Sequence, residues 1–154
     1  MKRFGGRSAV LLFVSLALFI PSCAPKKVRI FDMPEGARSD VVQIALAQQG
    51  KKYRSGNKGP DYFDCSGLIY FTYRQAGISV PLTAEAQGRY GAEIPRGEVQ
   101  PGDLVLFKIR KDDHIGIMIN SSDFVHASKS RGVAIDSLES TYWRRYVVGF
   151  RKLM

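Results

Sequence analysis

Apolar residues recur every three or four positions in the part of the chain that follows residue 38, which is the spacing of one face of an α-helix. Three such stretches each follow a residue that can cap a helix, namely Ser39, Asp64 or Thr83. Gly50 and Gly77 stand where the first two would end. The expected helices cover residues 40–49, 65–76 and 84–90.

Beyond Gly91 the pattern changes to short apolar runs, rich in Val, Ile and Phe, that are separated by Gly, Asp, Asn and Ser. Such runs are typical of strands joined by turns. The expected strands are Leu104–Ile109, Ile115–Asn120, Phe124–Ser128, Val133–Ser137 and Tyr146–Lys152. Helices followed by a series of strands predict an α+β domain, in which N-terminal helices pack on a mainly antiparallel sheet of about five strands.

The N-terminus has the pattern of a secretory signal. Lys2, Arg3 and Arg7 precede a run over residues 9–20 that is apolar apart from one serine. Twelve residues would span about 18 Å as a helix, which is shorter than the roughly 30 Å hydrocarbon core of a bilayer. We therefore expect a cleaved signal over residues 1–22 and no permanent transmembrane helix.

Cys23 ends the sequence Ile20-Pro21-Ser22-Cys23, which resembles the lipobox of bacterial lipoproteins. The resemblance implies cleavage before Cys23 and lipid on that residue; the alternative is an ordinary signal with an incidental cysteine. Residues 23–37 would then be the lipidated cysteine and a tether, and residues 38–154 the domain. By resemblance to Gram-negative lipoproteins, Ala24 favours an anchor in the outer membrane facing the periplasm, or in the plasma membrane of a Gram-positive source.

Length and charge narrow the class of protein further. The 154 residues suit one domain, and two cysteines are too few for the disulfide framework of small secreted proteins. The formal net charge is +9, and it falls to +6 when the predicted signal with its three basic residues is removed. An exported protein does not ordinarily meet nucleic acid, so anionic lipids and cell-wall polymers are the expected acidic partners. The alternative is a basic surface that only keeps the protein soluble.

Cys65 stands at the start of the second expected helix, directly after Asp64. Unpaired N–H groups and the positive end of the dipole at a helix start stabilise a thiolate, so we expect a lowered thiol pKa and a nucleophilic cysteine. The same amides can bind an oxyanion. The alternative is a small buried apolar residue, which is what most free cysteines are.

The two histidines of the chain lie on consecutive expected strands. His114 opens one strand and His126 lies within the next. Because side chains alternate along a strand, adjacent antiparallel strands can place both imidazoles on one sheet face. His114 would then take the proton of Cys65 while His126 fixes the tautomer of His114. Taken singly, each histidine would sooner be read as a structural residue whose polar atoms are satisfied.

Several short motifs follow one another along the chain. They are Tyr53, Phe63-Asp64-Cys65-Ser66-Gly67-Leu68, Gly77, Pro81, Gln87, Pro101-Gly102-Asp103-Leu104, His114-Ile115-Gly116 and His126-Ala127-Ser128. In this order they resemble the NlpC family of bacterial cell-wall peptidases, over residues 38–153. The small single-domain lipoprotein members are the most similar. The resemblance implies a papain-like fold.

The same resemblance assigns roles to individual residues. It implies that Cys65 is the nucleophile, His114 the general base and His126 the third, orienting member. The Tyr53 hydroxyl would help the Cys65 amide to bind the oxyanion, although aromatic packing over the helix is the alternative. Asp64 and Ser66 are candidates for contacts to the substrate, and Asp64 is also a candidate for the helix N-cap alone. No cofactor or metal is expected.

The activity implied by the resemblance is hydrolysis of an amide bond in murein, in a stem peptide or a cross-link next to diaminopimelate, through a cysteine acyl-enzyme. Stem peptides and the membrane are the expected partners of a monomeric enzyme. One alternative is an amidase or acyltransferase on the same scaffold, because an amine can also resolve an acyl-enzyme. Another is a non-catalytic wall-binding or metal-binding lipoprotein, since one thiolate and two imidazoles could ligate zinc.

Overall fold

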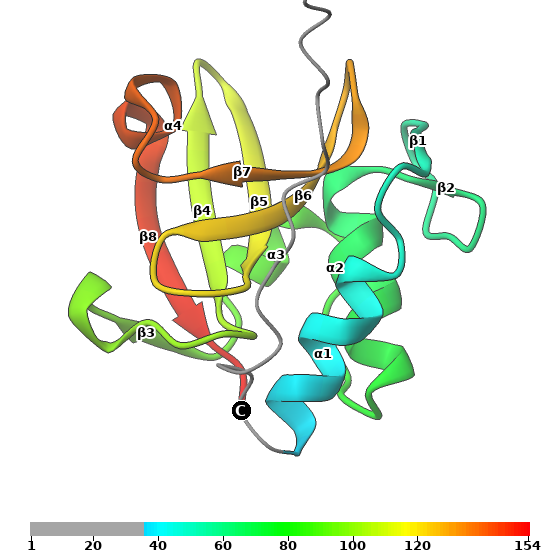
Figure 1. Ribbon diagram of the computed structural model, residues 1–154, viewed down its shortest axis with the longest axis horizontal. Helices are drawn as coiled ribbons and strands as arrows, with labels where there is room; N and C mark the ends of the chain where they lie inside the picture. The colour runs from blue at the N-terminus through cyan, green and yellow to red at the C-terminus, as the bar shows by residue number, and fades with distance from the viewer. Residues whose placement is uncertain (1–35) are drawn as a thin grey trace, which may run out of the picture.

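The computed structural model describes residues 36–154, so the predicted signal of residues 1–22, Cys23 and most of the predicted tether lie outside the described residues. Within residues 36–154, no helix is long and apolar enough to cross a membrane. In chain order the elements are α1 (Ala37–Leu46), β1 (Lys52–Tyr53), β2 (Tyr62–Phe63), α2 (Cys65–Gln75), α3 (Ala84–Gly88), β3 (Ala92–Ile94), η2 (Arg96–Glu98), β4 (Leu104–Ile109), β5 (Asp112–Met118), β6 (Asp123–Ser128), β7 (Gly132–Ser137), α4 (Thr141–Tyr146) and β8 (Val147–Lys152) (Figure 1).

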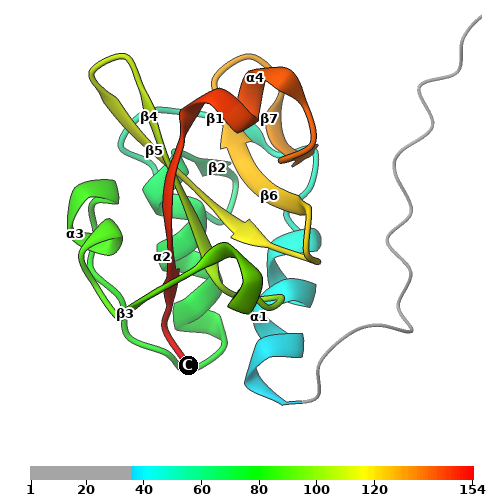
Figure 2. The ribbon, with the colours of Figure 1, turned by 90° about the vertical axis from the view of Figure 1, so that its left-hand side faces the viewer.

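The first helix begins earlier than the sequence pattern predicts. It starts after Gly36, which has a positive φ of 75° and no side-chain cap, so the predicted cap Ser39 lies inside the helix. Arg38 holds the additional residues in place, because its guanidinium donates to Asp103 Oδ1 at 2.8 Å and to the Met154 carbonyl at 3.1 Å. In Figure 2 the C-terminus accordingly lies at the same end of the molecule as the start of α1. The spacing of apolar residues along the sequence does not reveal contacts between such distant segments.

The caps predicted for the next two helices are confirmed. Asp64 Oδ1 accepts a hydrogen bond from the Gly67 N–H at 2.6 Å, and Thr83 Oγ1 accepts one from the Ala86 N–H at 3.2 Å. α3 is two residues shorter than predicted, because it ends at Gly88. Both caps satisfy backbone donors that would otherwise lack a partner at the helix start.

Six strands form one antiparallel sheet in the order β3-β8-β4-β5-β6-β7 (Figure 1). The predicted α+β class is therefore confirmed, with one strand more than predicted. β3 escapes the sequence pattern because it has only three residues and two of them are exposed. The six-residue helix α4, capped by Ser140 Oγ at the Trp143 N–H, is likewise too short to show a helical period.

Each face of the sheet carries an apolar layer. On one face, α1 and α2 pack on inward side chains of β4, β5 and β6 that include Ile115, Ile117 and Val125. On the other face, Trp143 of α4 packs with residues of β4, β6 and β8 such as Phe107. The candidate site combines α2 from the first layer with α4 from the second.

Candidate active site

Cys65 is the first residue of α2 and directly follows the Asp64 cap, as the sequence predicts. Burial of the side chain raises the pKa of the thiol, and the charge of Asp64 raises it further. The N–H groups of Ser66 and Cys65 hydrogen-bond to the sulfur and lower the pKa, but they do not compensate. The expected lowering of the thiol pKa is therefore wrong, because helix-start amides are weaker here than burial. The resting thiol is therefore protonated at neutral pH.

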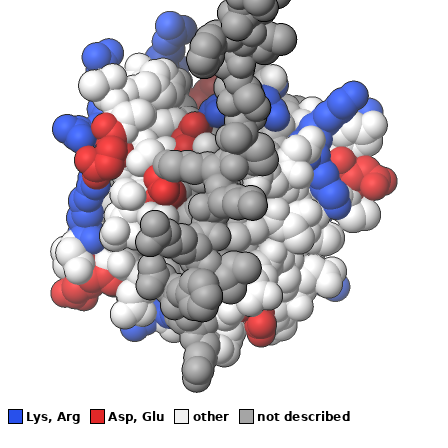
Figure 3. Space-filling model, viewed as in Figure 1, with Lys and Arg blue, Asp and Glu red and all other residues white. Residues whose placement is uncertain are grey.

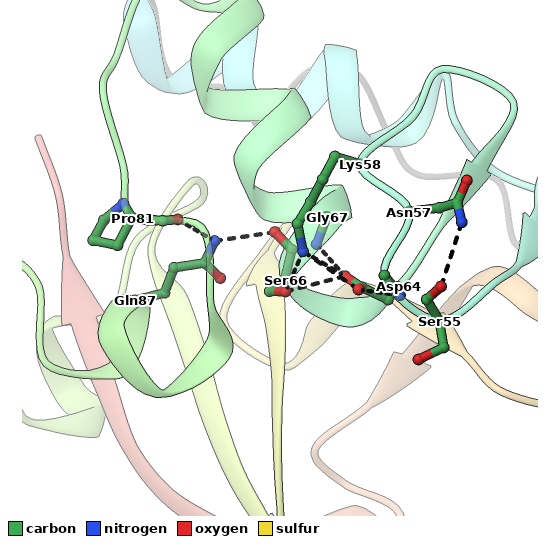
Figure 4. A network of polar contacts seen from close by, with 9 residues as sticks. Ser55, Asn57, Lys58, Asp64, Ser66, Gly67, Pro81 and Gln87 are labelled. Carbon is green, nitrogen blue, oxygen red and sulfur yellow. Dashed lines mark hydrogen bonds and ion pairs between the residues drawn. The ribbon is translucent and has the colours of Figure 1, made fainter.

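Hydrogen bonds within the protein engage both oxygens of the Asp64 carboxylate (Figure 4). Besides capping α2, Asp64 accepts from the Gly56 N–H at 2.9 Å, from Ser66 Oγ at 3.0 Å and from Lys58 Nζ at 3.3 Å. Ser66 is only 6% exposed, and its hydroxyl also accepts from Lys58 at 3.0 Å. The N-cap interpretation of Asp64 is thus confirmed, and contact of Asp64 or Ser66 with substrate stays a prediction.

The first turn of α2 is fixed by two close approaches. A Cβ on Gly67 would lie 2.0 Å from the Asn57 carbonyl oxygen, so only glycine lets the loop before the helix come this near. From the opposite side, Gln87 of α3 donates to the Ser66 carbonyl at 3.0 Å and to the Pro81 carbonyl at 2.8 Å (Figure 4). Cys65 therefore sits on a rigid support.

His114 and His126 lie next to each other on the sheet face that carries α4. His114 Nε2 is 2.8 Å from His126 Nδ1, which confirms that the two imidazoles share a face. The paired residues of β5 and β6 are Ile117 with Val125 and Met118 with Phe124, so His114 lies beyond the end of this ladder.

A cavity of about 690 Å³ opens at this end of the sheet. Cys65 and His114 both line it, together with His126 and Tyr53. Its remaining lining residues come from the facing ends of β4 and β5 with the turn between them, from the end of β6, the β6–β7 turn and the later part of β7, and from α4; they are Ile109, Lys111, Asp112, Asp113, Ser128, Lys129, Ser130, Arg131, Asp136, Tyr142 and Trp143. Four residues that the sequence singled out thus meet in one cavity.

Asp136 extends the pair of histidines to a chain of three groups. His126 Nε2 lies 2.9 Å from Asp136 Oδ2, and Arg131 also donates to that oxygen. Burial alone would raise the pKa of Asp136, but the hydrogen bonds and charges of His126 and Arg131 outweigh burial and lower it to about 2. The carboxylate is ionised at neutral pH and can only accept hydrogen bonds.

An ionised Asp136 fixes the tautomers of both neutral imidazoles. His126 Nε2 must carry a hydrogen in order to donate to the carboxylate, so His126 Nδ1 has a free lone pair. His114 Nε2 then donates to that lone pair, which leaves His114 Nδ1 without a hydrogen and able to accept a proton. This is the protonation state that a base for Cys65 requires.

The environment of His114 keeps the imidazole neutral. Burial lowers the pKa of His114 to about 3, and two charges act in the same direction: the one His126 would carry if it were protonated, and that of Lys129. Trp143 covers the ring, since the two ring centroids are 5.6 Å apart at an interplanar angle of 21°. Trp143 also contacts the His126 ring edge-on, with centroids 4.9 Å apart. The indole therefore packs against both imidazoles.

The residues of the site offer no arrangement for a metal. Within residues 36–154, no three His, Cys, Asp or Glu side chains form a group that could hold an ion. Both ring nitrogens of His126 are already engaged, by His114 and by Asp136. The metal-binding alternative therefore has no support in the geometry.

Comparison with known protein families identifies the family of this chain. The profile of the NlpC/P60 family matches residues 50–152, which include the candidate cysteine, both histidines and Asp136. The chain belongs to the NlpC/P60 family.

Curated NlpC/P60 relatives include proteins of Gram-negative bacteria. The chain is 38% identical over 110 residues to the murein DD-endopeptidase MepS/murein LD-carboxypeptidase of Escherichia coli, which covers 70% of this chain and 58% of that protein. It is 37% identical over 106 residues to a probable endopeptidase, an NlpC homolog of Haemophilus influenzae, which covers 68% and 57%. The chain spans about a fifth to three fifths of the length of the curated relatives that it matches.

Solved NlpC/P60 structures share the architecture. A family protein from Bacillus cereus superposes with a TM-score of 0.71 at 25% identity, covering 79% of this chain and 41% of the other. A lipoprotein-like family member from Staphylococcus aureus superposes with a TM-score of 0.70 at 29% identity, covering 86% and 44%. These likenesses confirm the predicted fold of the domain.

Two residues of this NlpC/P60 site were not predicted. Asp136 pairs with Phe124 across β6 and β7, so strand alternation puts it on the face that carries His126, but only the register of the strands shows this. Trp143 comes from α4, whose short length hides it in the sequence. The alternation of side chains along the expected strand Val133–Ser137 could have indicated Asp136. No periodic pattern of apolar residues indicated Trp143.

Proposed function

We propose that the protein is a cysteine peptidase that hydrolyses amide bonds in the peptide part of peptidoglycan. The observation that carries the proposal is the meeting of Cys65 with the His114–His126 pair in one open cavity. The endopeptidase names of the matched relatives support a murein substrate. The bonds considered are the γ-D-glutamyl bond within a stem peptide and the D-alanyl cross-link next to diaminopimelate.

Attack on the substrate starts from a neutral pair. Because the Cys65 thiol has a raised pKa and His114 a lowered one, Nδ1 of His114 accepts the thiol proton as sulfur attacks the carbonyl carbon. The imidazolium that forms is stabilised through His126 by the Asp136 carboxylate. Charge separation thus occurs only when the substrate is in place.

The acyl-enzyme forms and breaks through tetrahedral intermediates. The Cys65 N–H at the start of α2 and the Tyr53 hydroxyl, which lines the same cavity, are the proposed donors to the oxyanion. Protonated His114 gives its proton to the leaving amine, and neutral His114 then activates water to release the carboxylic acid. Tyr53 keeps its hydrogen for this role, because burial and the neighbouring Cys65 raise its pKa.

The proposal extends to the place where the enzyme acts. Lipid on Cys23 would hold the domain at the outer membrane, facing the periplasm and within reach of the wall, or at the plasma membrane in a Gram-positive source. Each buried methylene of the acyl chains contributes about 0.8 kcal/mol to such anchoring. After Cys23→Ala, the protein is expected in the soluble fraction of cells broken without detergent; retention on the membrane would contradict the anchor.

Digestion of isolated sacculi tests the proposed reaction. Mass spectrometry of the muropeptides after digestion is expected to show cleaved peptides that have gained one water, with one new amine and one new carboxyl group for each bond. An acyltransferase would instead give products joined to an added amine. Intact muropeptides after treatment with reduced, folded protein would contradict the proposal.

A further inference from the structure

Two hairpins that line the cavity are joined by an ion pair. Lys129 of the β6–β7 turn and Asp112, the first residue of β5 after the β4–β5 turn, lie 3.3 Å apart, Nζ to Oδ2. Both turns are at the upper end of the molecule in Figures 1 and 2. The two side chains are 75% and 72% exposed, so this pair contributes little to stability. A ligand with a negative charge can take the place of Asp112 at small cost.

The other charges of the cavity wall are committed to partners, with one exception. Arg131 is bound to Asp136, and Asp113 is paired at 2.8 Å with a lysine of β4. Lys111 makes no ion pair with another described residue. With Arg131 paired to Asp136 and Asp113 to its lysine, the charged lining residues that remain are Lys111, Lys129 and Asp112, one more positive than negative. Elsewhere Figure 3 shows basic side chains around the edge of the visible face, with acidic ones between them.

The excess charge lies close to the reacting groups. After burial and His126, Lys129 is the next influence that lowers the pKa of His114, and it opposes the rise caused by burial in the pKa of Tyr53. Lys129 lines the same cavity as Cys65, His114 and Tyr53. An anion bound to Lys129 would therefore lie in the cavity that holds the reacting groups.

We propose that Lys111 and Lys129 form a subsite for a free carboxylate of the substrate, next to the scissile amide. The inference rests on the proposed function and names the chemistry that it selects. D-glutamate linked through its γ-carboxyl keeps its α-carboxylate, and diaminopimelate in a cross-link keeps the carboxylate beside the linked amine. Each bond under consideration therefore has a carboxylate within one residue. Amidation of that group removes its charge, so the subsite discriminates against amidated murein.

Matched substrates test this subsite. The probes are two purified cross-linked muropeptide dimers that differ only in whether these carboxyl groups are free or amidated. The wild type is expected to cleave the free dimer with a kcat/KM about fivefold higher, the size of one partly exposed charge interaction. In Lys111→Gln/Lys129→Gln the preference disappears, mainly through KM on the free dimer. The control Lys152→Gln removes one positive charge outside the cavity and keeps the preference.

Equal cleavage of both dimers by the wild type, or an undiminished preference in the double variant, would overturn the subsite while leaving the proposed function intact. A wild type that cleaves neither dimer would contradict the proposed function instead. Calorimetry with Cys65→Ala tests the subsite separately from the proposed function, because it measures binding of the dimers without their cleavage. Tighter binding of the free dimer, lost in the double variant, supports the subsite; equal affinity for both dimers overturns it.

Discussion

A single carboxylate decides which nitrogen of His114 is free to act as a base. Asp136 accepts from His126 and thereby sets both tautomers, although it is two groups away from the Cys65 thiol. Asp136 is a positioning residue, since it acts through His126. The hydrogen bonds from His126 and then from Arg131 lower the pKa of Asp136, so an exposed arginine also contributes to its ionisation.

Asp136→Leu is expected to lower kcat at least about tenfold with little change in KM, because nothing then holds the hydrogen on His126 Nε2. Asp136→Asn should lower kcat less, since the amide oxygen can still accept a hydrogen bond from His126 Nε2. Nitrogen chemical shifts of the His114 ring report its tautomer directly, and they should move in Asp136→Leu. Asp61→Asn, which changes a carboxylate outside the cavity, is the control. An unmoved tautomer and an unchanged kcat in Asp136→Leu would contradict the role.

The three central side chains should differ in how much activity their loss removes. Cys65→Ala and His114→Ala are expected to abolish turnover, because nucleophile and base take part in the bond changes themselves. His126→Ala should keep partial activity, since water can still bind His114 Nε2. Rates on one muropeptide dimer, with thermal unfolding as a check of folding, measure the difference; a His126→Ala variant as inactive as His114→Ala would contradict this order.

At the scale of elements, the geometry of Cys65 depends on how closely the loop before α2 approaches the helix. Gly67→Ala puts a methyl group 2.0 Å from the Asn57 carbonyl and 2.9 Å from Asp64 Oδ1. Because a backbone atom must move, we expect a loss of about 2 kcal/mol in the free energy of unfolding and a lower kcat.

Gly97→Ala is the matched control, because a Cβ there meets nothing within 4 Å. It should change the free energy of unfolding by less than about 0.5 kcal/mol. Urea unfolding of both variants measures the difference. Equal stability of Gly67→Ala and the wild type would show that the loop yields without cost.

Elements with strong local signals could be predicted from the sequence, and elements held by distant contacts could not. The Asp64 and Thr83 caps were visible because capping is a short-range interaction. The early start of α1 depends on Arg38 reaching the C-terminus. The raised pKa of Cys65 depends on burial by the folded chain. Residue order alone cannot give the balance between helix-start amides and burial.

For the whole molecule, the half-buried neutral imidazole of His114 links stability to pH. Unfolded His114 binds a proton below its ordinary pKa of 6.5, whereas folded His114 does so only near 3. The unfolded state therefore holds more protons between pH 6.5 and 3, and the free energy of unfolding falls as pH falls through this window, by up to about 1.4 kcal/mol per pH unit. Asp136 adds to the loss between pH 3.8 and 2.

His114→Gln should remove most of this dependence between pH 6 and 4. Denaturant unfolding at several pH values is expected to show that the free energy of unfolding of the variant falls less than that of the wild type as the pH is lowered. If the free energy of unfolding depends on pH in the same way in both proteins, His114 is not the group responsible.

The central claim is that Cys65 of this domain cuts murein peptides, and one comparison tests it most directly. Sacculi are incubated with wild type and with Cys65→Ala, both shown to be folded, and newly released amine and carboxyl termini are counted by mass spectrometry. We predict release by the wild type and none above background by Cys65→Ala. Equal release by the two proteins would contradict the account.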